Sequence, residues 1–116
     1  MAYTESESQG PTLSLEERVS LELGLKTLAS REFLKTCFDN ARLFDKKQSD
    51  YGSRNISGFG TFGIIVRMND KFERLKTLLG KKRRKPQNES IMDSLRDISN
   101  YANIAIMVET NKWPDE

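Results

Sequence analysis

Acidic side chains on one face of the last predicted helix are the strongest chemical signal in this 116-residue sequence. Glu89, Asp93 and Asp97 follow one another every four residues, and Asn100 continues the row, so in a helix they project from one side. Stacked like charges repel one another, and neighbouring basic residues or a divalent cation must offset them. Two or three such carboxylates can hold Mg²⁺ beside a phosphate. Two interpretations remain open, a metal site and a solvated acidic face.

The preceding predicted helix carries an acidic row and a basic row side by side: Asp70 and Glu73, and Arg67, Lys71 and Arg74. If the two helices pack antiparallel, its carboxylates share a cleft with those of the last helix, and its cations reach a bound phosphate. Ion pairs on a solvated helix surface explain the same spacing without a ligand.

Two short motifs precede these helices in a polar segment. Asp50, Tyr51 and Gly52 form a DYG string in which Tyr51 can stack on a base or fold onto the core. Three glycines further on match G-x-G-x-x-G, but no strand pattern precedes them, which argues against a dinucleotide site. They indicate a turn into a helix, or backbone N–H groups that a helix N-terminus offers to an anion.

Five consecutive cations occupy residues 81–85. The run can contact phosphates or nucleic acid, or it can be a solvated connector between two helices. The whole chain has 19 basic and 17 acidic residues, a net charge of +2, which does not favour a dedicated duplex binder.

Composition excludes several kinds of chemistry. The sequence has no histidine, which excludes Ser-His-Asp catalysis and histidine-ligated zinc. Its single cysteine, Cys37, cannot form an internal disulfide and is expected to be a buried packing residue. No apolar run approaches the ~20 residues of a membrane span. We therefore expect a cytoplasmic protein without a membrane partner.

Apolar periodicity predicts an all-α fold, a small bundle of three to four helices. Residues 1–12 are expected to be a disordered leader, residues 13–112 a single helical domain and residues 113–116 a tail. A first helix is predicted after a Ser14–Glu17 capping box, and a second over residues 30–47. A third is predicted over residues 61–79, where Gly80 ends it, and a fourth after an N-cap at Asn88. The two middle helices have apolar stripes: Phe33, Leu34, Cys37, Phe38, Ala41 and Phe44, and Ile64, Ile65, Met68, Phe72, Leu75 and Leu79.

Residues 101–108 are apolar almost all round the last helix. A helix of this kind needs several neighbours, and so short a chain offers few. We therefore expect a homo-oligomer, a dimer or larger, to complete the bundle.

Three strings also carry a family resemblance: DYG at residues 50–52, FGTFGIIVRMNDKFERL at residues 59–75, and NESIMDSLRDISNYA at residues 88–102. Together they resemble the largely phage-encoded family called nucleotide modification associated domain, first type. The resemblance covers roughly residues 33–108 and implies an α-helical protein of phage nucleotide metabolism or base modification, located in the host cytoplasm.

The second and third strings are distantly similar to all-α nucleoside triphosphate pyrophosphatases of the MazG type. In that family two acidic pairs on adjacent helices bind Mg²⁺ and assist the attack of water on the triphosphate. The resemblance makes Asp70 and Glu73 one pair and Asp97 a member of the other. This chain departs from the pattern because Ser94 stands where the second pair needs a glutamate, so Asp93 or Glu89 must substitute.

Three functions therefore follow as hypotheses. The first is a Mg²⁺-dependent nucleoside triphosphate pyrophosphohydrolase, with Asp70, Glu73, Asp93 and Asp97 in catalysis and Glu89 as a further metal ligand. In that hypothesis Asp50, Tyr51, Gly52, Arg67, Lys71, Arg74 and Asn100 bind the nucleotide. The second is a non-catalytic protein that sequesters a nucleotide or cyclic nucleotide. The third is a nucleic-acid-associated accessory protein that uses residues 81–85.

Overall fold

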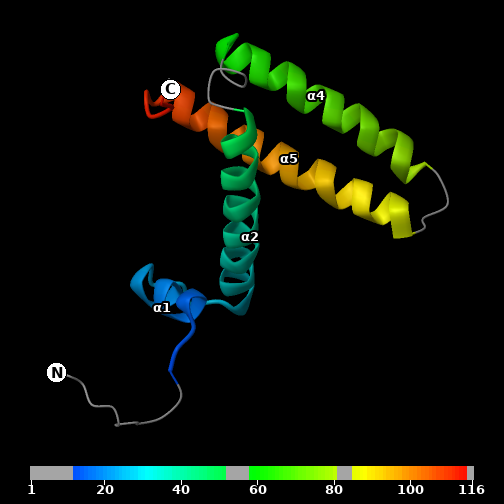
Figure 1. Ribbon diagram of the computed structural model, residues 1–116. Helices are drawn as coiled ribbons and strands as arrows, with labels where there is room; N and C mark the ends of the chain where they lie inside the picture. The colour runs from blue at the N-terminus through cyan, green and yellow to red at the C-terminus, as the bar shows by residue number, and fades with distance from the viewer. Residues whose placement is uncertain (1–11, 52–57, 81–84, 115–116) are drawn as a thin grey trace. The chain divides into compact units, whose positions relative to one another are not determined.

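The computed structural model describes residues 12–51, 58–80 and 85–114, and every regular element in these ranges is an α-helix. In chain order they are α1 (Leu15–Glu22), α2 (Leu28–Tyr51), α4 (Gly60–Leu79) and α5 (Lys85–Glu109) (Figure 1). The predicted all-α fold is confirmed. None of the described helices has the length and apolar content needed to cross a bilayer. The chain forms two compact units, Met1–Asp39 and Asn40–Glu116.

The first unit contains α1 and the start of α2. The predicted capping box is present, because the Glu17 amide donates to the Ser14 hydroxyl at 3.1 Å and the Ser14 amide donates to the Glu17 carboxylate at 2.8 Å. Gly24 then turns the chain at φ 69°, a conformation that costs glycine little. The amide of Ser30 donates to the Thr27 hydroxyl at 3.0 Å, and this cap starts α2 at Leu28, two residues before the predicted start.

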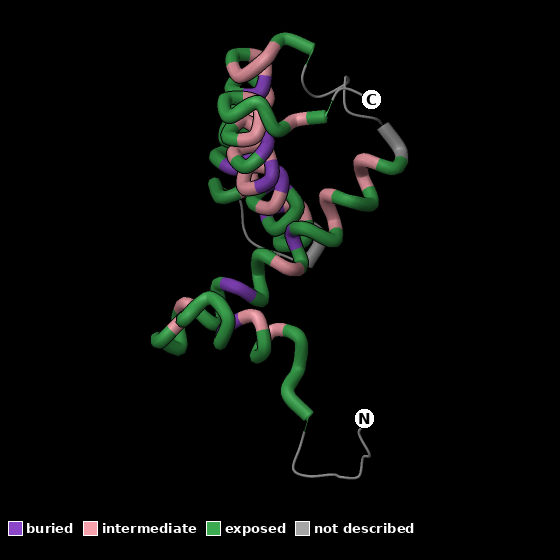
Figure 2. Tube along the Cα trace, turned by 90° about the vertical axis from the view of Figure 1, so that its left-hand side faces the viewer, coloured by how far each residue is buried: buried purple, intermediate pink, exposed green. Residues whose placement is uncertain are grey.

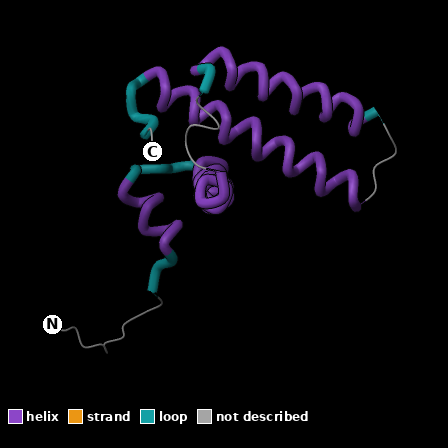
Figure 3. Tube along the Cα trace, turned by 45° about the horizontal axis from the view of Figure 1, so that its top comes forward, coloured by secondary structure: helices purple, strands orange, loops and turns teal. Residues whose placement is uncertain are grey.

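The second unit is built on an antiparallel hairpin of α4 and α5, which lie side by side in two views (Figures 1 and 3). Its core contains Ile64 and Leu75 from α4 and Ile91 and Ile104 from α5. Ser94 is also buried, and its small side chain allows the two helices to approach closely. Buried positions recur along the hairpin in Figure 2, so the α4–α5 seam is the core of this unit.

The last turns of α2 pack against α5 through polar groups. The Asn100 amide donates to the Asn40 carbonyl at 3.2 Å, and the Asn40 amide donates to the Ser99 hydroxyl at 3.3 Å. Beyond the end of α5, Trp113 meets Phe44 edge to face, with ring centroids 6.0 Å apart. These contacts hold α2 across α5.

Two predicted helix ends are wrong by about one turn. The second helix continues past residue 47 to Tyr51; Ser49, which suggested a loop, donates its hydroxyl to the Asp45 carbonyl at 3.2 Å and so fits within the helix. The last helix begins at Lys85, before the predicted cap at Asn88. Pro86 is tolerated there because an N–H group in the first turn of a helix has no acceptor within the helix, so its absence costs no hydrogen bond.

Part of the predicted apolar stripes is exposed. On α2, Leu34 is buried, but Phe33, Cys37 and Ala41 are exposed, so the expectation of a buried Cys37 is wrong. On α4, Ile64 is fully buried, whereas three other members of its stripe are exposed: Ile65, Phe72 and Leu79. Each helix buries only the arc that faces its one or two neighbours, and the rest of its apolar surface remains uncovered.

Candidate functional site

Asp97 is the point at which three helices of the second unit meet. It is buried on α5, and its two carboxylate oxygens accept from two different lysines. The Lys47 ammonium of α2 lies 2.7 Å from Oδ1, and the Lys71 ammonium of α4 lies 3.0 Å from Oδ2. One carboxylate therefore ties α2 and α4 to α5.

These ion pairs shift the protonation of the groups that form them. Burial disfavours the charged carboxylate of Asp97, but hydrogen bonds and attraction from Lys47 and Lys71 outweigh it and hold the pKa of Asp97 below its ordinary value. Burial also disfavours the charged Lys47, yet the hydrogen bond and charge of Asp97 raise the pKa of Lys47. Asp97 and Lys47 are therefore both ionised at neutral pH.

An open groove of about 410 Å³ lies beside this centre. It is lined by four residues of α4 and one of α5: Arg67, Asp70, Lys71, Arg74 and Tyr101. The α4 residues fall at helical spacing, one turn apart, so the fold gathers them on one side of the helix. The lining carries three cations and one carboxylate, an excess of two positive charges, together with one aromatic ring.

The structure brings together only part of the predicted site. Arg67, Lys71, Arg74 and Asp70 share the groove. Glu73 points to another side of α4, where its carboxylate pairs with the Lys76 ammonium at 3.0 Å.

The predicted α5 residues are dispersed. Glu89 and Asp93 are exposed on α5, and Asn100 is buried with its amide on the Asn40 carbonyl. Gly52 and residues 81–84 lie outside the described residues, as do the side chains of Asp50, Tyr51 and Lys85.

In the described part of the chain the predicted Mg²⁺ ligands do not gather at one point. Within the described ranges, no three acidic or cysteine side chains gather in a way that would hold a metal ion. Asp97, the residue that the pyrophosphatase resemblance makes a ligand, already accepts from two ammonium groups. A divalent cation at Asp97 would have to displace them and would be repelled by their charge.

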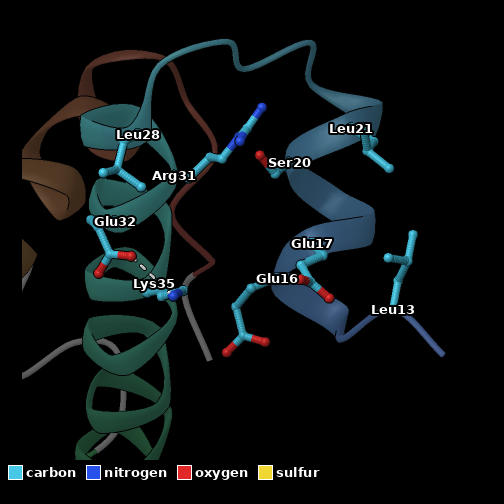
Figure 4. Close-up of a pocket in the computed structure, with 9 residues that line it drawn as sticks. All are labelled: Leu13, Glu16, Glu17, Ser20, Leu21, Leu28, Arg31, Glu32 and Lys35. Atoms are coloured by element: carbon cyan, nitrogen blue, oxygen red, sulfur yellow. Dashed lines mark hydrogen bonds and ion pairs between the residues drawn. The ribbon is translucent and has the colours of Figure 1, made fainter. Parts of the chain in front are cut away.

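A second cavity, of about 380 Å³, lies in the first unit between α1 and α2 (Figure 4). Leucines line part of it, among them Leu21 and Leu28. Its charged groups are partly engaged within the unit, because the Lys35 ammonium pairs with the Glu32 carboxylate at 3.0 Å. The lining of this cavity has three carboxylates and two cations, so its net charge does not favour a phosphate.

Sequence reasoning missed two residues of the site. Lys47 gave no signal, because its partner lies 50 positions away along the chain. Tyr101 was assigned to apolar surface, although its position one turn after Asp97 places it beside the same acidic residue. That spacing was the signal that could have found it.

Comparisons of the chain with protein-family models, with curated proteins and with solved structures found no match. The resemblance to nucleotide modification proteins therefore rests on the sequence motifs alone.

Proposed function

We propose that this protein binds a nucleotide through its phosphates in the groove on α4. The observation that carries the proposal is the convergence of Arg67, Lys71 and Arg74 with Tyr101 in one open groove. Arginine and lysine donate charge-assisted hydrogen bonds to phosphate oxygens. An aromatic ring beside the cations offers a face on which a base can stack.

The size and charge of the groove support this ligand class. Its volume of about 410 Å³ falls within the range of roughly 300–1,000 Å³ for small-molecule sites. Asp97 holds the Lys71 ammonium at 3.0 Å, which fixes one cation in place before a ligand arrives. A cation positioned in this way loses less side-chain entropy when it binds a phosphate.

The same geometry favours binding over hydrolysis. The hydrolytic hypothesis needs Asp97 as a metal ligand, and this carboxylate is neutralised by Lys47 and Lys71. A protein that holds or sequesters a nucleotide needs only the cations and the ring. We therefore propose a nucleotide-binding protein, and no step of the proposed function passes through Mg²⁺.

Replacing Arg74 with glutamine tests the groove. Arg74 is exposed and lines the groove, so Arg74→Gln removes one cation without opening the core. A charge-assisted hydrogen bond contributes about 1.5–3 kcal/mol, and we expect the affinity for the preferred nucleotide to fall about tenfold or more. Isothermal titration calorimetry with ATP, GTP, CTP, UTP and cyclic AMP measures it.

Lys76 provides the matched control. It is also an exposed cation of α4, but it pairs with Glu73 and does not line the groove. Lys76→Gln should leave the affinity within about twofold, since the loss of a remote surface charge is screened by salt. Equal losses in both variants, or no binding of any nucleotide to the wild type, would contradict the proposed site. Chromatography of the same mixtures, with Mg²⁺ added, distinguishes retained intact nucleotide from hydrolysed product.

A further inference from the structure

A row of exposed apolar side chains runs along each helix of the α4–α5 hairpin. On α4 the row repeats every seven residues, at Ile65, Phe72 and Leu79; on α5 it comprises Met92, Leu95 and Ile106. These six side chains are between 48% and 60% exposed. A seven-residue apolar repeat is the spacing with which one helix packs along another.

Both rows lie on the same side of the hairpin. With about 100° of rotation per residue, Ile65 lies on one side of the buried Ile64 and the groove residue Arg67 lies on the other. On α5, Leu95 and Asp97 flank the buried Ser94 in the same way. The Lys71–Asp97 ion pair joins the two helices on the groove side. In an antiparallel pair, the side of α4 opposite the groove and the side of α5 opposite the groove then face the same way. The six residues therefore form one face.

The uncovered area is what a stable dimer needs. An aromatic side chain buries roughly 150–250 Å² when fully covered and the aliphatic ones somewhat less, so six that are about half exposed leave at most roughly 600 Å² of apolar surface. Standard interfaces bury about 800 Å² per partner, with the polar rim included. Monomeric proteins rarely leave so large an apolar face in water.

We infer that this face, formed by Ile65, Phe72, Leu79, Met92, Leu95 and Ile106, binds the same face of a second copy of the chain. Two hairpins related by a two-fold axis then form a four-helix bundle. The charge at the face suits a second copy better than an anionic membrane, because Lys76 on α4 is already neutralised by Glu73 at 3.0 Å. The assembly does not depend on the proposed nucleotide, since Arg67 and Arg74 lie on the other side of the hairpin.

A single charge on the face tests the inference. The wild type should have twice the chain mass of 13.3 kDa in light scattering at micromolar concentration. In Phe72→Glu the carboxylate would be buried in the interface without a partner, so this variant should have the mass of one chain. Val66→Glu is the control, because Val66 is equally exposed on α4 but lies a further 100° round the helix; it should keep the wild-type mass.

A wild-type monomer, or a dimer that persists in Phe72→Glu, would overturn the inference. If circular dichroism shows that Phe72→Glu has lost its helices, Ile106→Glu on α5 decides instead, since Ile106 is the most exposed residue of the face.

Discussion

Replacing Ile104 with aspartate is expected to unfold the second unit. Ile104 is only 3% exposed in the α4–α5 core, so the new carboxylate would be buried among apolar side chains. The cost is about several kcal/mol whether the group stays charged or takes up a proton, and it is comparable to the whole stability of a small domain. Circular dichroism and thermal melting should show loss of the cooperative transition at neutral pH.

Ile106→Asp is the matched control for this prediction. Ile106 lies two residues further along the same helix and is 60% exposed in the single chain, so its carboxylate does not enter the core of the unit. This variant should keep its helicity and a cooperative transition, with a change in mass if the exposed face forms the dimer. Similar melting of the two variants would show that the hairpin is packed in another register.

Replacing Asp97 with asparagine is expected to destabilise the second unit by about 2 kcal/mol. The change leaves Lys47 and Lys71 without the carboxylate that pairs with both of them. Breaking a fully buried pair costs about 3–5 kcal/mol, but the Lys47 side chain is 45% exposed, so water screens part of the loss. Urea unfolding measures the change, with Asp93→Asn as the exposed control from the same acidic row.

The pH dependence of stability gives the same prediction an independent check. The pKa of Asp97 is lowered in the folded state, so its contribution is present above about pH 4 and is lost as the pH falls through the folded pKa. The pKa of Lys47 is raised, so its contribution is lost only as the pH rises above about 10. Asp97→Asn should therefore show a flatter acid limb than the wild type. An unchanged acid limb would mean that the ion pairs contribute nothing to stability.

Most of the fold could be predicted from the sequence because its signals are local. The capping box of Ser14 and Glu17 starts α1 as expected, and Gly80 caps the end of α4. The first turn of α5 could not be predicted because Pro86 indicates a break between the basic run and the helix, although helices accept proline in their first turn.

Which apolar residues are buried could not be predicted, because burial depends on the number of neighbours. Cys37 and Phe72 have helical core spacing, yet both are exposed. Ile104 was expected to need another subunit, but it is only 3% exposed within the single chain. The sequence therefore indicates that the chain has more apolar residues than it can bury, but not which residues of the hairpin stay exposed.

The candidate site shows the same division between local and long-range information. Helical spacing correctly placed Arg67, Lys71 and Arg74 on one side of α4. The repulsion in the acidic row also had to be offset, and the structure shows that lysines of two neighbouring helices offset it at Asp97. Spacing within one helix could not reveal this, because Lys47 and Asp97 are 50 residues apart.

Mapping a bound nucleotide on the isotope-labelled protein by nuclear magnetic resonance tests the central claim most directly. During titration with ATP, or with the nucleotide that calorimetry shows to bind most tightly, the largest chemical-shift changes should fall on the groove residues Arg67, Lys71, Arg74 and Tyr101. Changes centred on the cavity between α1 and α2, or none with any nucleotide of the panel, would contradict nucleotide binding in the groove.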